Sequence, residues 1–219
     1  MREYWNKNKW ALLITSVVIL LPILGGVLLW DKMPEQIPYH WGINGEVDGW
    51  ASKPVAVFLM PLFLLAMQWL CFFASAWDPK SRNISGKMLG LVLWIIPILN
   101  ILLNVMVYIA ALDRRVDVSV IIPLFLGTLF VVIGNYLPKC KQSYTLGIKL
   151  PWTLNDEQNW NATHRLAGKL WVAGGLLCMP CTLLPPVACF VAIMAVLLVM
   201  VIVPTVFSYR YYKKHKSKE

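Results

Sequence analysis

The most constraining feature of this sequence is a series of long apolar runs that carry almost no charge. The first extends from Trp10 to Trp30 without one charged residue, and the second from Pro54 to Trp77 has Gln68 as its only strongly polar member. Two more runs follow, from Met88 to Leu112 and from Val118 to about Leu137. A helix needs roughly 20 mostly apolar residues to cross the hydrocarbon core of a bilayer. Each of these runs therefore predicts a membrane-spanning helix.

The last apolar run, residues 170–208, is too long for one span. Its 39 residues would form a helix of about 58 Å, roughly twice the hydrocarbon thickness. Consecutive prolines at 185 and 186 remove two backbone donors and break the helix there. The run therefore predicts a fifth and a sixth helix joined by a short turn, and the fifth is expected to begin before Leu170.

Composition and charge agree with this pattern. The chain is 58% hydrophobic and only 14% charged, whereas a soluble domain carries about 25% charged residues. The formal charge of +9 comes from lysines and arginines that lie between or beside the apolar runs, which favours membrane topology over nucleic-acid binding. With six spans, sixteen basic residues fall on one side and four on the other, so both termini are predicted to be cytoplasmic.

The segment between the first two spans, residues 31–53, is predicted to be a small ordered outer loop. Pro34 and Pro38 favour extended backbone. Asn44-Gly45 and Asp48-Gly49 are turn signals, and Asn-Gly is able to close a hairpin. Its four acidic residues outnumber its two lysines.

Two roles for this loop stay open: a lid that packs on the helix ends, and a site that attracts a cationic peptide. The candidate binding residues are Pro34, Pro38, Tyr39, His40, Trp41 and Asp48. A metal site at His40, Glu46 and Asp48 is disfavoured, because the spacing matches no established ligand pattern. We expect no metal and no cofactor.

The longest polar stretch, residues 138–169, is predicted to be cytoplasmic. Thr153 and Asp156 form a variant of the capping box, which predicts a helix running into the fifth span. On that helix Trp160, His164 and Trp171 share one face, and such a face most often packs. Cys140 with His164 lacks a third orienting group, so the sequence predicts no enzyme.

Within the spans no Asp, Glu, Lys, Arg or His interrupts the apolar runs, which argues against a coupled pump. Asn100 and Asn104 lie one turn apart on the third span and are the main intramembrane polar pair. Asparagine at such positions usually forms hydrogen bonds between helices. Cys178-Met-Pro-Cys181 is a weak metal or redox motif, because it lies in lipid and lacks a second pair.

The two polar segments together resemble the SdpI-like family of bacterial membrane proteins. The outer segment, with Met33-Pro34, Ile37-Pro38, His40-Trp41, Gly45, Asp48-Gly49 and Lys53-Pro54, is similar to the family's N-terminal module of unknown function. The inner segment is similar to its C-terminal module, through Gly134-Asn135-Tyr136, Pro138, Lys141-Gln142, Gly147-Ile148-Lys149, Pro151-Trp152-Thr153-Leu154, Trp160, Thr163-His164-Arg165 and Gly168-Lys169. Met33 stands where leucine is common, and Lys149 where arginine also occurs.

The resemblance implies a multi-pass protein of the bacterial cell membrane that gives immunity to a secreted, membrane-active peptide toxin. In the best-known branch of the family the protein also holds a transcriptional repressor at the membrane, with no direct nucleic-acid binding by the membrane protein itself. On this basis the inner candidate residues for partner binding are Asn135, Lys149, Pro151, Trp152, Thr153, Trp160, His164 and Arg165.

The predicted fold is thus an all-α polytopic membrane bundle of about six transmembrane helices. A two-helix module is expected at residues 1–87, with the outer loop 31–53, and a four-helix SdpI-like module at 88–219, with the cytoplasmic segment 138–169. A transporter or exporter of small hydrophobic compounds remains the alternative function, because Gly25-Gly26, Gly174-Gly175 and the proline breaks permit the close packing and kinks that transporters use.

Overall fold

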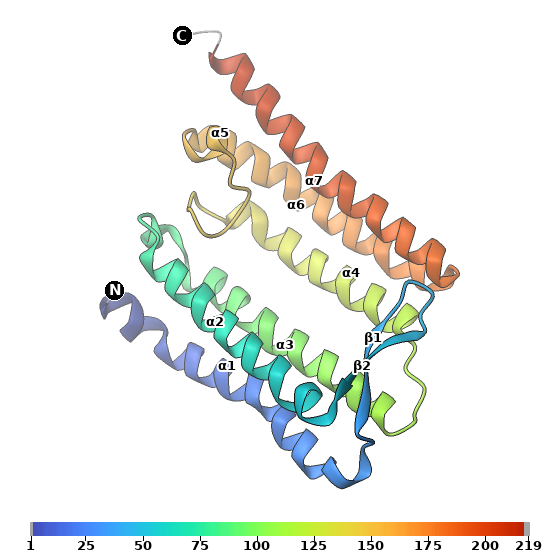
Figure 1. The fold of residues 1–219 in the computed structure, drawn as a ribbon. Coiled ribbons are helices and arrows are strands. Elements are labelled where there is room, and N and C mark those ends of the chain that lie inside the picture. The colour runs from blue at the N-terminus through green and yellow to red at the C-terminus, as the bar shows by residue number, and fades with distance from the viewer. Residues whose placement is uncertain (1, 217–219) are drawn as a thin grey trace. The chain divides into compact units, whose positions relative to one another are not determined.

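The computed structural model describes residues 2–216, and these form two compact units. The first comprises the chain through Trp77 together with Ser85–Asp117, and the second comprises Asp78–Ile84 together with the chain from Val118. Figure 1 shows both units as helical, with one small sheet in the first. The predicted all-α membrane fold is confirmed.

The first unit holds three long helices and a β-hairpin. Helix α1 spans Arg2–Leu28, and α3 spans Gly86–Ala111. Helix α2, Met60–Trp77, is preceded by a π-helical turn η2 at Val55–Leu59. Between α1 and η2 lie a 3-10 turn η1, Trp30–Lys32, and antiparallel strands β1, Gln36–Trp41, and β2, Val47–Ser52. The three helices lie side by side (Figure 1).

The second unit holds three further long helices and a polar loop. Helix α4 spans Val118–Tyr136, α6 spans Glu157–Cys178, and α7 spans Pro186–Lys216. The short elements are η3 at Ser81–Asn83, η4 at Leu137–Lys139, α5 at Pro151–Leu154 and η5 at Met179–Leu183. Helices α4, α6 and α7 pack together (Figure 1).

Among residues 2–216, six helical segments are long and apolar enough to cross a membrane. They are Glu3–Leu28, Val55–Trp77, Gly86–Ala111, Val118–Lys139, Glu157–Leu183 and Pro186–His215. The chain is therefore a multi-pass membrane protein in contact with lipid. The fifth helix begins well before Leu170, as predicted, and the break falls at Pro185, with Pro186 as the first residue of α7. That is the helix position where a missing N–H costs least.

The third helix joins the first unit through polar contacts within the predicted span. Asn100 Nδ2 donates to the Ile19 carbonyl of α1 at 2.7 Å, and within α3 Asn104 Nδ2 donates to Asn100 Oδ1 at 2.9 Å. One turn on, the Tyr108 hydroxyl donates to the Pro22 carbonyl at 2.9 Å. Hydrogen bonds of this kind hold helices together where lipid offers no hydrophobic driving force. The compact units thus group α3 with α1 and α2, whereas the sequence-based boundary at residue 87 places it with the C-terminal helices.

Helices α4 and α6 approach each other through glycines. A Cβ added at Gly175 of α6 would lie 2.5 Å from the Gly127 carbonyl oxygen of α4, closer than real Cβ atoms come. Small residues at such crossings let two backbones come into direct contact. This contact fixes α6, and with it the residues that α6 presents to the polar loop.

Candidate functional site

The outer segment forms a β-hairpin that turns at Asn44-Gly45, as the Asn-Gly signal predicts. The Gly42 amide donates to the Glu46 carbonyl at 2.9 Å, and Gly45 adopts a positive φ of 80°. The second expected turn, at Asp48-Gly49, is wrong because both residues lie in β2. Gly49 pairs with His40, and a Cβ at Gly49 would lie 2.8 Å from the His40 Cβ. The glycine makes room for the histidine side chain across the strand pair.

One face of this hairpin cap, defined here as residues 33–53, is packed on the helix ends of its own unit. Met33 and Ile37 are buried in a cluster with Ala56 and Val57 of η2 and with α3. Pro38 is also buried. The Lys53 side chain, 6% exposed, lies with its Nζ 3.0 Å from Glu35 Oε1 and 5.3 Å from the Trp30 ring. The cap is therefore an ordered platform held by apolar contacts.

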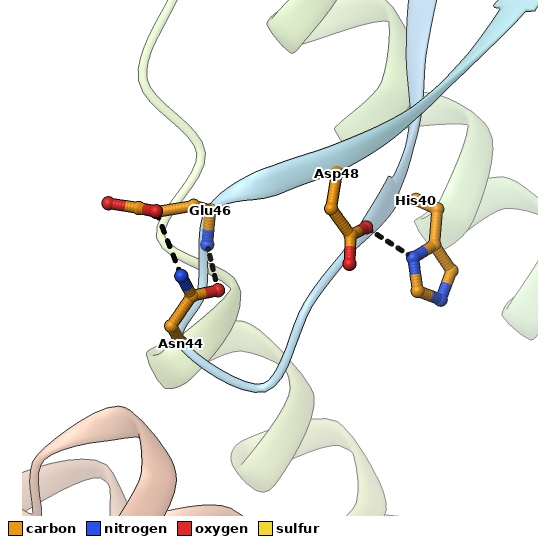
Figure 2. Close-up of polar contacts among 4 residues, drawn as sticks. All are labelled: His40, Asn44, Glu46 and Asp48. Carbon is orange, nitrogen blue, oxygen red and sulfur yellow. Dashed lines mark hydrogen bonds and ion pairs between the residues drawn. The ribbon is translucent and has the colours of Figure 1, made fainter.

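The other face of the hairpin cap is open. His40 Nδ1 lies 2.5 Å from Asp48 Oδ1, with side chains 72% and 53% exposed, and Figure 2 shows the pair beside the Asn44–Glu46 contact. Trp50 is 61% exposed next to them in β2. The open face thus offers an acidic group, an imidazole and an aromatic ring to a ligand.

The predicted outer residues divide between the two faces. His40 and Asp48 are exposed, and so is Pro34. Tyr39 and Trp41 are half-buried against the apolar cluster, and burial raises the pKa of the Tyr39 hydroxyl. Within residues 2–216 no group of three His, Cys, Asp or Glu side chains is placed to hold a metal.

In the second unit, the polar segment at residues 140–154 (the 140–154 loop) is held by a buried carboxylate that sequence reasoning missed. Asp78, 5% exposed, directly follows α2. Its Oδ2 accepts hydrogen bonds from the amides of Tyr144 and Thr145 at 2.8 and 2.9 Å and from the Thr145 hydroxyl at 2.8 Å. Its Oδ1 accepts from the Lys80 amide at 2.7 Å. Four donors on one carboxylate make this a tight clamp.

Asp78 belongs to a short segment, residues 78–84, that we call the strap. Gln142 of the loop makes a second attachment to this strap. Its carbonyl oxygen accepts from Asn83 Nδ2 at 2.8 Å, and its side-chain oxygen accepts from Lys80 Nζ. Its Nε2 donates to the carbonyls of Thr153 and Leu154, each at 2.8 Å. Both ends of the 140–154 loop are thereby tied together.

The other side of the loop rests on α6 through His164 and Trp160. The Ile148 amide donates to His164 Nε2 at 2.9 Å, and His164 Nδ1 lies 2.8 Å from the Trp160 carbonyl, so the assigned tautomer carries its proton on Nδ1. The two rings stack at 4.1 Å. Trp160 Nε1 donates to the Cys140 carbonyl at 2.7 Å. Both residues therefore position the loop, and both ring nitrogens of His164 are engaged by the backbone.

Cys140, the first residue of the loop, has a buried side chain. It is 5% exposed, its Sγ is 3.7 Å from the Leu146 carbonyl, and burial raises the pKa of its thiol to about 11. A thiol needs a nearby base to become a nucleophile at neutral pH, and the His164 nitrogens are already occupied. Cys140 and His164 are thus both held in contacts with the loop backbone.

The helix start differs in detail from the expectation. Asp156 itself caps α6 by accepting from the amides of Gln158 at 2.8 Å and Asn159 at 3.0 Å. Thr153 is not the cap: its hydroxyl is buried, accepts from the Leu150 amide at 3.0 Å and donates to the Ile148 carbonyl at 2.8 Å. The predicted Thr153 cap is wrong because an aspartate closer to the helix offers the better acceptor.

Trp152 joins α5 to the end of α7. Its Nε1 donates to Ser208 Oγ at 2.9 Å, and its ring packs 5.2 Å from the Tyr209 ring. The remaining predicted inner residues are exposed, namely Asn135, Lys149, Pro151 and Arg165. Trp171, from the predicted helix face, is half-buried against Phe130. The inner set thus splits into a buried framework and an exposed group.

Comparisons with known proteins cover both candidate regions. The model of the SdpI/YfhL protein family matches residues 139–208, which include the 140–154 loop, α6 and most of α7. A domain of unknown function, DUF1648, matches residues 17–65, which include the hairpin cap. The chain is 27% identical over 207 residues to a protein of Bacillus subtilis (strain 168) named "Immunity protein SdpI", covering 92% of this chain and 96% of that protein. No solved structure matches. The predicted resemblance is confirmed.

Proposed function

Because this chain resembles the SdpI-like family along nearly its whole length, we propose that it is a membrane immunity protein, protecting the cell that makes it against a secreted, membrane-active peptide toxin. The observation that carries the proposal is the similarity to a curated immunity protein over 92% of the chain. The six candidate spans agree with a protein that acts within the membrane.

We propose that both termini, the strap and the 140–154 loop lie in the cytoplasm, and that the hairpin cap faces outward. The support is the excess of lysine and arginine on that side, sixteen residues against four, since short basic segments are retained inside. Fusion of a reporter active only in the cytoplasm to each end tests this arrangement. Activity from only one of the two ends would contradict it.

In this arrangement the open face of the hairpin cap is the first contact for the toxin. The cap is already ordered by its buried face, so little conformational entropy is lost when a peptide binds. Asp48 and Glu46 are exposed on it, while Lys53 is buried and paired with Glu35. Outside this ion pair, the exposed charged residues of the segment 31–53 are Asp31, Glu46 and Asp48 against Lys32. This acidic excess suits a cationic peptide, and the exposed Trp50 ring suits an apolar one.

The experiment is survival of a toxin-sensitive bacterial strain that expresses the chain. We expect protection from the cognate peptide, and we expect His40→Ala and Asp48→Ala to lower it without changing the amount of protein in the membrane. Ser52→Ala, exposed on the same strand, is the matched control and should protect fully. Protection that is unchanged in both variants would remove the outer site, and no protection by the unaltered chain would remove the immunity role.

Two mechanisms of protection, export of the peptide and capture of the peptide, are distinguished by measuring flux in proteoliposomes. Capture requires no turnover, so we expect no accumulation of labelled peptide or of small hydrophobic compounds. Sustained, saturable flux would instead support the transporter alternative.

For the inner side, we propose that the exposed residues Lys149, Pro151 and Arg165, together with Asn135, form the contact surface for a cytoplasmic repressor. They are open while their neighbours Thr153, Trp160 and His164 are buried in the framework. Charge reversal at Lys149 and Arg165 should abolish recruitment of a repressor encoded beside this gene to the membrane. Fluorescence microscopy of the labelled repressor measures this recruitment. Recruitment that survives both reversals would exclude this surface.

A further inference from the structure

The register of the hairpin cap determines which of its backbone groups stay unpaired. Beside the strand ends, the Lys53 amide donates to the Glu35 carbonyl at 3.0 Å. In an antiparallel pair, positions that exchange hydrogen bonds alternate with positions that do not. Two positions further along, Ile37 and Ala51 are therefore hydrogen-bonded to each other. The pairs whose backbone groups point away from the partner strand are Gln36–Ser52 and Pro38–Trp50.

The two outer edges of this small sheet consequently differ in what they offer. On β2 both outward residues, Trp50 and Ser52, carry an N–H donor and a C=O acceptor. On β1 the outward Pro38 has no N–H, so Gln36 alone donates from this stretch. Within the described part of the first unit, no backbone group outside the hairpin bonds to the outward groups of Trp50 and Ser52. Proline on an edge strand blocks the addition of a further strand, so β1 is blocked and β2 is open.

The side chains along the open edge suit a cationic segment with apolar residues. Asp48, Trp50 and Ser52 alternate along β2 and are exposed, and Figure 2 shows Asp48 beside His40. A strand added at this edge places every second side chain next to this row. A lysine or arginine in the added strand is attracted to the Asp48 carboxylate, and an apolar or aromatic side chain covers the Trp50 ring.

We propose that the free edge of β2 binds an extended segment of the peptide toxin as a third strand of the sheet. The inference rests on the proposed function, because it states how the outer site recognises its peptide. Backbone hydrogen bonds at Trp50 and Ser52 supply affinity that depends little on the sequence of the peptide, whereas the side chains of Asp48 and Trp50 select a cationic, partly apolar strand. The buried face of the hairpin holds this edge in place before the peptide arrives.

Alternation along the peptide backbone is the signature that tests strand addition. The probe is a dye-labelled synthetic peptide of about eight residues, the length of an ordinary strand, in which threonine alternates with lysine or phenylalanine. Fluorescence anisotropy follows its binding to the full-length protein in non-ionic detergent micelles, with empty micelles as background. We expect saturable binding. Binding to empty micelles alone would overturn the proposal.

Two twin peptides locate the backbone contact without any change to the protein. One is N-methylated on its threonine amides, and the other on its lysine and phenylalanine amides, so both keep every charge. An added strand turns only one of these sets toward β2. One twin should therefore bind about 10-fold more weakly than the probe, and the other within about 2-fold. Equal binding by the two twins would overturn strand addition.

On the protein, Ser52 allows the backbone and the side chain to be tested separately. Ser52→Pro removes the outward N–H and places a ring on the edge, a position where proline is tolerated, and it should weaken binding of the probe about 10-fold. Ser52→Ala keeps the N–H and should bind within about 2-fold of the unaltered chain. Gln36→Pro, at the paired position of β1, is the matched control for proline and should also stay within about 2-fold. Equal losses for the two proline variants would overturn the choice of β2.

The survival experiment separates this inference from the immunity role. Full protection by Ser52→Pro, with protection lost in Asp48→Ala, would keep the outer site and overturn strand addition. An alternating loss with the twin peptides, without protection of cells by the unaltered chain, would keep strand addition and remove the immunity role. A dimer in micelles that light scattering detects and Ser52→Pro dissociates would assign the edge to a second copy of this chain, and would overturn the peptide as its occupant.

Discussion

The hairpin cap and the 140–154 loop are both ordered polar segments, but they are anchored by different forces. The hairpin is fastened by apolar side chains such as Ile37 and leaves its polar pair, His40 and Asp48, in solvent. The loop is fastened by buried polar groups, above all Asp78 and His164, and leaves its cations outside. Apolar contacts weaken in proportion to the area lost, whereas a buried hydrogen-bond network fails when one member leaves its partners unsatisfied. The loop is therefore the more switch-like of the two regions.

The largest effect is expected for Asp78→Ala. The substitution leaves the buried amides of Tyr144 and Thr145 without their acceptor, and the free energy of unfolding should fall by about 4 kcal/mol. Thermal or denaturant unfolding of the purified protein in micelles measures this. Ser85→Ala removes only the side-chain cap of α3 and should cost about 1 kcal/mol; equal losses in the two variants would show that the clamp is no stronger than a surface cap.

Ile37→Ala is expected to come next, at about 3 kcal/mol, the cost of a cavity at a fully buried aliphatic position. The same unfolding experiment measures it. Because the hairpin is stabilised in proportion to the apolar area that it buries, Ile37→Val should cost only about 1 kcal/mol. A loss for valine as large as for alanine would mean that the hairpin, too, fails as a unit, and the contrast between the regions would disappear.

The loop should also shield its thiol. Burial raises the pKa of Cys140 to about 11, from an ordinary value of 9.0, and the thiolate is the form that reacts. At pH 8 the reactive fraction should therefore be about 100-fold lower than for an open thiol. The rate of alkylation should keep rising with pH to about 11 and should titrate near 9 once Asp78→Asn opens the loop. A midpoint near 9 in the unaltered chain would contradict the shielding.

The smallest effect concerns two glycines with positive φ, one in each region. Gly147 has a φ of 106°, and a Cβ there would lie 2.6 Å from His164 Nε2. Gly147→Ala should cost about 2 kcal/mol, because backbone strain adds to a clash with a hydrogen-bonded ring. Gly45 lies in the hairpin turn, and Gly45→Ala should cost about 1 kcal/mol from backbone strain alone. A larger loss at Gly45 than at Gly147 would reverse the comparison.

Local signals in the sequence predicted much of this architecture. The uncharged runs predicted the spans, Pro185-Pro186 predicted the break, and Asn44-Gly45 predicted the hairpin turn. Where two local signals competed, the outcome depended on neighbours: Asp48-Gly49 extends β2 because Gly49 accommodates His40 across the pair, and Asp156 caps α6 in place of Thr153. The inner candidates were found through family resemblance, which did not reveal that Thr153, Trp160 and His164 are buried while Lys149 and Arg165 are exposed.

By itself the sequence determined that lipid surrounds most of this chain and where the chain leaves it, because transfer from water to hydrocarbon depends on the local run of side chains. Only the tertiary structure decided that Asp78 grips residues 144 and 145, that Asn100 ties α3 to α1, and that Cys140 is covered. A hydrogen bond between residues more than sixty positions apart leaves no periodicity or spacing in the sequence. It exists only once packing has brought its donor and acceptor to within about 3 Å.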